Sequence, residues 1–260
     1  MKFFAKIILV LILIPSIIIV LFSATIKFQL FDPNFWKDDF KNNNVYFNLS
    51  NDLKTYTEDQ NIKGGAKTGD LKVITDVITP TILEDFISHN IDNSLAFING
   101  GKKELLVYLP VGKIPKELAP KSVGLNTEEI PLAALMTKFN VDANTIPISQ
   151  IAYFGTFVNY LLVGSAILTA MFLIFLFLLT ENGDRFISIG LSFVLSGFVI
   201  LSSSKIFNSV QITNKIAADI LPSVLMQISK TWSLIGVITL VVGIIFLFLK
   251  KPSFKKPNKL

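Results

Sequence analysis

Four long runs of apolar residues without a charged side chain constrain this chain more than any other feature. They cover residues 7–26, 151–180, 186–204 and 231–249. An α-helix rises about 1.5 Å per residue, so about 20 residues cross the roughly 30 Å hydrocarbon core of a bilayer. The sequence therefore predicts a mainly α-helical membrane protein with four transmembrane helices.

The first run has the layout of either a retained anchor or a cleaved signal peptide, because Lys2 and Lys6 precede it. Signal cleavage needs small residues at two positions before the cut, but the bulky Phe22 lies two residues before Ala24. We therefore expect residues 1–26 to hold a short cytoplasmic amino terminus and a retained transmembrane helix. Cleavage remains the alternative.

Basic residues predict the orientation of the four helices. An inside amino terminus puts Lys2, Lys6, Arg185 and the lysine-rich tail on the cytoplasmic side, which satisfies the positive-inside rule. We expect a multi-pass protein of the cell membrane with both termini in the cytoplasm. Residues 181–185 would then form a cytoplasmic turn, and residues 27–150 and 205–230 would be extracytoplasmic.

The carboxy-terminal tail, residues 250–260, concentrates positive charge in a short segment. Its lysines would attract anionic lipid headgroups, or they would only fix the topology. The lysines assigned to this lipid surface are Lys250, Lys251, Lys255 and Lys256. Because this tail accounts for the net charge of +5, the charge indicates membrane lipids as partners and no nucleic acid.

Residues 27–150 are numerous enough to bury a core and carry charges of both signs, as a solvated domain does. Asp32 before Pro33 predicts a helix start, and the three asparagines 42–44 predict its end. Residues 57–70 contain three glycines and few large apolar residues, so they are predicted to form a loop.

The clearest helix of this domain is predicted over residues 80–98, where Thr79 caps the start and Asn99-Gly100-Gly101 ends it. Residues 102–109 are rich in strand formers and predict one short strand or hairpin. A further short helix is expected over residues 131–139. The extracytoplasmic domain should therefore be mostly helical.

Apolar residues recur at helical spacing in residues 205–230. Two arrangements fit this pattern: an outward extension of the third and fourth helices as a helical hairpin that breaks near Pro222, or a helix along the membrane surface. We favour the hairpin, because Pro222 is able to open a helix that runs into the fourth span.

Small and hydroxyl-bearing residues in the last two runs indicate close helix packing, since small side chains let helices approach in lipid. The residues assigned to this packing are Ser188, Gly190, Ser192, Ser196, Gly197, Gly236 and Gly243. An ion path is the alternative. Ion paths usually carry ionisable groups within the membrane, and none of the four runs contains one.

His89 is the single histidine of a chain without cysteine. Asp85 lies four residues before it and Asp92 three residues after it, so the three side chains would share a stretch of helix surface. They are the candidates for a catalytic site built on a carboxylate-oriented base. A lone histidine is a poor metal signature, so we expect no metal and no cofactor.

The plan of this chain is one anchor, then a long loop, then three closing spans. The loop contains the predicted helix that begins at Pro80, the sequence Asn99-Gly100-Gly101 and the predicted strand around residues 105–109. This plan resembles uncharacterised four-span bacterial envelope membrane proteins with a long first extracytoplasmic loop. The resemblance covers the whole chain and implies no known activity.

These observations favour a non-enzymatic cell-envelope protein that displays an outer domain for interaction with a protein or lipid. Its partners would be membrane lipids and either an envelope protein or further copies of the chain. One alternative is a subunit of an oligomeric pore or transporter. A second alternative is a membrane-tethered enzyme, which would need Asp85, His89 and Asp92 to converge.

Overall fold

The computed structural model describes residues 2–64, 76–113, 128–138, 140–141, 148–180, 182–207, 209–210 and 215–249. The chain is mainly helical and divides into two compact units. We call one the span unit, which contains Met1–Lys27, Val158–Gln211 and Leu225–Leu260. The other is the inserted unit, which contains Phe28–Phe157 and Ile212–Val224.

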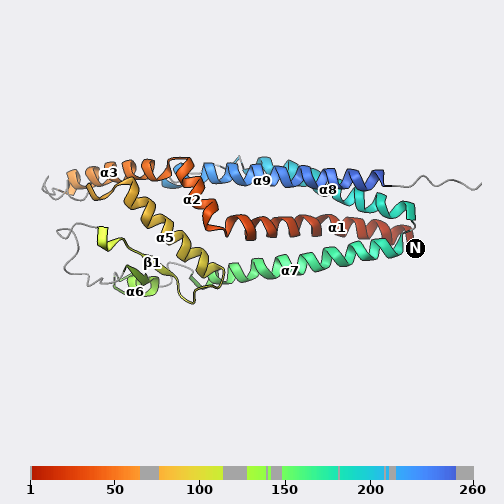
Figure 1. The fold of residues 1–260 in the computed structure, drawn as a ribbon, viewed down its shortest axis with the longest axis horizontal. Helices are drawn as coiled ribbons and strands as arrows, with labels where there is room; N and C mark the ends of the chain where they lie inside the picture. The colour runs from red at the N-terminus through yellow and green to blue at the C-terminus, as the bar shows by residue number, and fades with distance from the viewer. Residues whose placement is uncertain are drawn as a thin grey trace, which may run out of the picture. The chain divides into compact units, whose positions relative to one another are not determined.

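Four helices are long and apolar enough to cross a membrane, which suggests a membrane protein (Figure 1). They are α1 (Lys2–Thr25), α7 (Ile148–Leu179), α8 (Asn182–Phe207) and α9 (Lys215–Phe248). A short π-helix, η1 (Ile26–Leu30), continues α1, and the first candidate span covers Phe4–Leu30. The four transmembrane helices expected from the sequence are present by length and composition.

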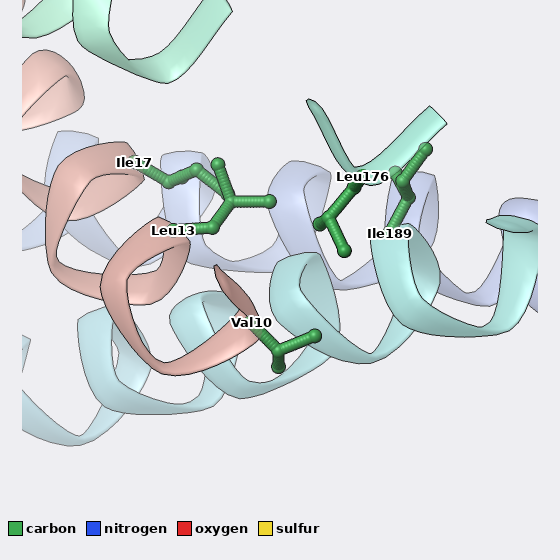
Figure 2. Close-up of a cluster of buried hydrophobic side chains, with 5 residues drawn as sticks. All are labelled: Val10, Leu13, Ile17, Leu176 and Ile189. Carbon is green, nitrogen blue, oxygen red and sulfur yellow. The ribbon is translucent and has the colours of Figure 1, made fainter. Parts of the chain in front are cut away.

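The core of the span unit forms where α1, α7 and α8 meet (Figure 2). Leu13 of α1 and Leu176 of α7 are completely buried there. The remaining buried members of this cluster are Val10, Ile17 and Ile189. This cluster joins residues from the first and second candidate spans with the start of the third.

Large apolar side chains face outward along α7. Tyr160 is 75% exposed and Leu178 is 70% exposed, and many of the side chains between them are also exposed. A helix that is apolar on all sides is expected in a protein core or in a membrane, and an exposed one fits hydrocarbon rather than water. The outward face of α7 therefore supports the assignment of this helix as a membrane span.

The inserted unit is built around α5 (Pro80–Ile98), which packs against α2 (Pro33–Asn42), α3 (Val45–Gly64) and β1 (Leu106–Tyr108) (Figure 1). Strand β1 pairs antiparallel with β2 (Glu129–Pro131), so that Val107 lies opposite Ile130. The short helices η2 (Val111–Lys113) and α6 (Leu132–Lys138) follow the two strands. The strand expected within residues 102–109 is confirmed as β1, but its partner β2 was not predicted, and Pro131, the expected first residue of a short helix, lies in β2.

Both predicted helix starts are confirmed by their caps. The Asp32 carboxylate accepts a hydrogen bond from the Asn34 backbone N–H at 2.9 Å, and Pro33 opens α2. The Thr79 hydroxyl accepts one from the Ile82 backbone N–H at 3.3 Å, and Pro80 opens α5. These side chains satisfy backbone donors that a helix start leaves without an intrahelical partner.

The prediction of a loop over residues 57–70 is wrong for its first part, because α3 continues to Gly64. The segment 57–64 has few apolar residues, but Glu58, Gln60 and Lys63 are good helix formers that extend an established helix. The rest of that predicted loop, residues 65–70, lies outside the described residues.

The helices also extend beyond the charge-free runs. Helix α7 begins at Ile148, α8 begins at Asn182 within the expected turn 181–185, and α8 ends at Phe207. Helix α9 begins at Lys215 and continues through Pro222, so the break predicted near Pro222 is wrong. Backbone hydrogen bonding does not stop where apolar composition stops, so helix ends and span ends differ.

Candidate functional site

The structure brings two of the three catalytic candidates together on α5. The His89 Nδ1 atom lies 2.8 Å from the Asp85 carbonyl oxygen and 3.4 Å from Asp85 Oδ1. Asp92 belongs to a different interaction, because the Lys37 ammonium of α2 donates to both of its carboxylate oxygens at 2.6 and 2.7 Å. The three residues share a helix, but only Asp85 and His89 share a set of contacts.

Two residues that sequence reasoning missed complete the surroundings of Asp85. The Tyr108 hydroxyl of β1 and the Lys113 ammonium of η2 each lie 2.8 Å from Asp85 Oδ2. The Tyr108 ring also stacks on the His89 ring, with centroids 4.2 Å apart. We call these four residues, Asp85, His89, Tyr108 and Lys113, the Asp85 cluster.

The cluster shifts the proton affinity of two of its members. The hydrogen bond from Lys113 is the main reason that the pKa of Asp85 is lowered from its ordinary value. The hydrogen bond to Asp85 raises the pKa of Tyr108 to about 12. Near neutral pH, Asp85 is therefore a paired carboxylate and Tyr108 a neutral phenol.

The hydrogen bond of His89 fixes the tautomer of its neutral ring. A carbonyl oxygen only accepts, so the Nδ1 atom facing the Asp85 carbonyl carries the hydrogen. The Nε2 atom is then the basic nitrogen, on a side chain that is 51% exposed.

The remaining polar contacts hold the paired strands β1 and β2 against α5. The Asn90 side-chain amide donates to the Tyr108 carbonyl at 2.9 Å, and its oxygen accepts from the Tyr108 backbone N–H at 3.0 Å. The Lys102 ammonium donates to the Asn93 amide oxygen at 2.7 Å, and Asn93 donates to Glu129 at 3.1 Å. The cluster is thus part of a network that positions β1 and β2.

An apolar groove lies between α2 and α5 in the same unit. It has a volume of about 280 Å³. Its lining residues are Trp36, Phe86, Ile87, Asn90, Ile91, Ser94 and Leu95. The Trp36 indole N–H donates to the Leu30 carbonyl at 2.7 Å, which ties one wall of the groove to the end of η1.

A buried carboxylate links α2 to the amino-terminal part of α9. Asp39 is completely buried, and its oxygens accept hydrogen bonds from the Ser223 hydroxyl at 2.6 Å and the Asn43 amide at 3.1 Å. Helical spacing puts Asp39 on the same face of α2 as Phe35 and Trp36, whereas its neighbour Asp38 is exposed. Both hydrogen bonds stabilise a charge that water does not reach.

In the span unit, the serines assigned to packing are bonded within α8. Ser188, Ser192 and Ser196 are each buried and donate to the carbonyl four residues earlier, at 2.8 to 3.0 Å. Ser196 Oγ also lies 3.3 Å from the Ile14 carbonyl of α1. These hydroxyls therefore find acceptors inside the bundle.

The glycines assigned to packing lie where α8 and α9 come closest. A Cβ atom at Gly190 would meet the Gly243 carbonyl oxygen at 2.8 Å, and one at Gly197 would meet the Gly236 carbonyl oxygen at 2.8 Å. Real Cβ atoms essentially never approach backbone this closely. The two helices touch through positions where a side chain has no room.

The lipid-surface candidates Lys250, Lys251, Lys255 and Lys256 lie outside the described residues. In the part of the chain that the structure describes, no group of three or more histidine, cysteine, aspartate and glutamate side chains is arranged to hold a metal ion. No known protein family, curated protein or solved structure matches this chain. The candidate sites therefore rest on geometry alone.

Proposed function

We propose that this chain is an integral protein of the cell envelope that displays the inserted unit on the extracytoplasmic face of the membrane as a binding domain. Both termini are cytoplasmic in this proposal, as the positive-inside rule favours. The partner is another envelope molecule, and the four membrane helices hold the domain where that molecule is found.

Helix continuity between the units is the observation that carries the proposal. In the described part of the chain, three of the four candidate membrane helices extend into the inserted unit. Helix α1 continues through η1, which enters the inserted unit at Phe28. Helix α7 begins in the inserted unit at Ile148, and α9 leaves the inserted unit after Val224. These helices join the inserted unit covalently to the proposed membrane anchor at several points along the chain.

The polar groups of the span unit favour anchoring over transport. Ser16 of α1 and Thr169 of α7 lie 2.6 Å apart, and the Trp232 indole of α9 donates to Ser203 of α8 at 2.9 Å. Such bonds join helices to each other. A transport path would need polar groups that face a cavity, commonly ionisable ones.

The Asp85 cluster gives the enzyme alternative little support. Asp85 already accepts from Tyr108 and Lys113, and Asp92 is paired with Lys37 on another helix. Among the described residues, the carboxylates nearest to His89 along α5 are therefore already engaged by other side chains.

Cross-linking in intact cells tests the proposal. An amine-reactive cross-linker that does not enter cells is applied to cells making the tagged full-length chain, and linked peptides are identified by mass spectrometry. We expect reproducible links from Lys102, Lys103 and Lys113 to one different envelope molecule.

The matched control replaces these three lysines by arginine, which keeps the charge and removes the reactive amine. Links through these positions should disappear in Lys102→Arg/Lys103→Arg/Lys113→Arg, while the amount of protein in the membrane stays the same. Links confined to copies of this chain would contradict the proposal and support a self-contained oligomer instead.

A further inference from the structure

From the apolar groove between α2 and α5, we infer that the inserted unit binds a hydrocarbon chain of a membrane lipid. The inference rests on the proposed function, and it adds a lipid ligand to the envelope partner that the displayed domain binds. It concerns the groove lined by Trp36 of α2 and by one face of α5.

The lining of the groove suits an apolar ligand. Aromatic and aliphatic side chains provide most of its wall, as in typical small-molecule sites. Asn90 adds little polarity, because its amide donates to Phe86 and Tyr108 carbonyls and its oxygen accepts from the Tyr108 N–H. An apolar cavity of about 150 Å³ takes up benzene, so a groove of about 280 Å³ has room for several methylene groups.

The position of the groove along the chain selects a lipid as its occupant. Trp36 is bonded to the carbonyl of Leu30, which is the last residue of the first candidate membrane span. One wall of the groove is therefore fixed to the end of the first candidate membrane span. Tryptophan is enriched at membrane interfaces because its ring is apolar and its N–H is polar.

An ion pair between the same two helices keeps the groove formed. Lys37 follows Trp36 along α2, Asp92 follows Ile91 along α5, and their side chains are joined at 2.6 Å. The pair joins α2 and α5 beside the lining residues, and the groove is open without a ligand. A lipid chain entering it would bury apolar surface without first paying to separate the helices.

A partner helix is the less suitable occupant. Helix-in-groove recognition uses several apolar anchors spaced over two or more turns, as at positions i, i+3, i+4 and i+7. The lining residues run from Phe86 to Leu95 along α5, but α2 contributes the single side chain of Trp36, so the opposite wall has no room for a row of anchors. One flexible hydrocarbon chain fits that extent better than a row of anchors.

Tryptophan fluorescence tests the inference, because the chain has two tryptophans and only Trp36 lines the groove. The full-length Trp232→Phe variant is reconstituted into vesicles of phosphatidylcholine with or without bromine atoms along the acyl chain. Bromine quenches an indole that it contacts. We expect brominated lipid to lower the Trp36 emission.

Filling the groove separates bound lipid from bulk lipid. Ser94→Phe, added to Trp232→Phe, places a ring in the groove and should abolish the quenching by brominated lipid. Thr81→Phe is the matched control on an exposed α5 position outside the lining, and it should leave the quenching unchanged. Ile87→Asn should also reduce the quenching by making the wall polar without adding bulk.

Three results would overturn the inference: no quenching of Trp36, equal quenching in the Ser94→Phe and Thr81→Phe variants, or a protein cross-link that only Ser94→Phe removes. Circular dichroism identifies any variant that has lost its helical fold. Failure here leaves the proposed display of a binding domain intact, since that proposal is tested separately by cross-linking.

Discussion

Side chains satisfy their hydrogen bonds differently in the two units. In the span unit, hydroxyls such as those of Ser192 and Thr239 donate to the carbonyl four residues earlier, at 3.0 and 2.7 Å. In the inserted unit, charged groups and amides reach other elements, as Lys113 reaches Asp85 and Asn90 reaches Tyr108. Short hydroxyl side chains thus make many of the polar contacts in the span unit, and longer charged or amide side chains make them in the inserted unit.

The difference follows from the surroundings that each unit fits. In hydrocarbon, an unpaired charge is costly, whereas a serine hydroxyl finds an acceptor within its own helix and leaves the helix surface free for close packing. In water, charged pairs cost less to form and also contribute less. Five predictions test this contrast, from the largest expected effect to the smallest.

Close packing at glycine should dominate the stability of the span unit. A Cβ atom at Gly243 would lie 2.6 Å from the Val194 backbone nitrogen, so Gly243→Leu should force α8 and α9 apart. Overpacking typically costs about 1–3 kcal/mol and occasionally more, and we expect the upper end here because backbone must move. Thermal unfolding of the purified protein in detergent measures the loss.

Gly164 provides the matched control on α7, since a Cβ atom there would meet nothing within 4 Å. Gly164→Leu makes the same chemical change on an exposed helix surface and should leave the unfolding temperature nearly unchanged. Equal losses in the two variants would contradict the packing account.

The buried carboxylate of Asp39 should dominate the polar contribution in the inserted unit. Asp39→Ala removes the acceptor of Ser223 and Asn43, and hydrogen bonds to charged groups contribute about 1.5–3 kcal/mol. Urea unfolding of the full-length protein should show this loss for Asp39→Ala and almost none for Asp38→Ala, whose side chain is exposed. A similar midpoint for the two variants would refute the assigned role of Asp39.

The Asp85 cluster should titrate as a coupled set. Because the hydrogen bond to Asp85 raises the pKa of Tyr108 to about 12, Asp85→Asn should lower that pKa toward the ordinary value of about 10. NMR titration of ring-labelled tyrosine measures it, and Tyr108→Phe assigns the resonance. Ser88→Ala, which removes a contact of Tyr46 instead, should leave the Tyr108 titration unchanged.

The same shift predicts how stability depends on pH. Folding raises the pKa of Tyr108. The contribution of Tyr108 to the free energy of unfolding is therefore complete below about pH 10 and is lost as the pH rises toward about 12. The pKa of Asp85 is lowered on folding, so its contribution is present above the ordinary carboxylate pKa and is lost in acid. Unfolding midpoints of the wild type that stay flat in both ranges would argue against the cluster.

The ion pair between Lys37 and Asp92 should have the smallest effect. A double-mutant cycle with Lys37→Met and Asp92→Asn should give a coupling free energy of about 0.2–1 kcal/mol that falls as salt is added. The corresponding cycle with Ser16→Ala and Thr169→Val in the span unit should give a coupling that salt does not change. Opposite salt responses would break the contrast between the units.

Local signals predicted the parts of the fold that depend on neighbouring residues. Asp32 before Pro33 and Thr79 before Pro80 each place a helix start, because a cap acts within one turn. The four apolar runs predicted the four candidate spans, because the length and composition of a span are also local properties of the sequence. The prediction of a loop over residues 57–64 is wrong, because a segment with few apolar residues still extends helix α3 to Gly64.

Contacts between distant segments explain what the sequence could not predict. Tyr108 and Lys113 reach Asp85 only because β1 and η2 fold back onto α5. Asp39 is buried only because the start of α9 covers α2 at Ser223. The spacing of Asp85, His89 and Asp92 gave their common helix, but the partner on α2 that separates Asp92 from the others has no local signature.

Cysteine accessibility in intact cells tests the central claim most directly, because the natural chain contains no cysteine. Single variants Lys103→Cys in the inserted unit and Ser253→Cys in the tail are treated with a maleimide that does not cross membranes. The account predicts labelling of Lys103→Cys in intact cells and labelling of Ser253→Cys only after the membrane is permeabilised. The reverse pattern, or labelling of both variants in intact cells, would contradict an extracytoplasmic domain held by a four-helix anchor.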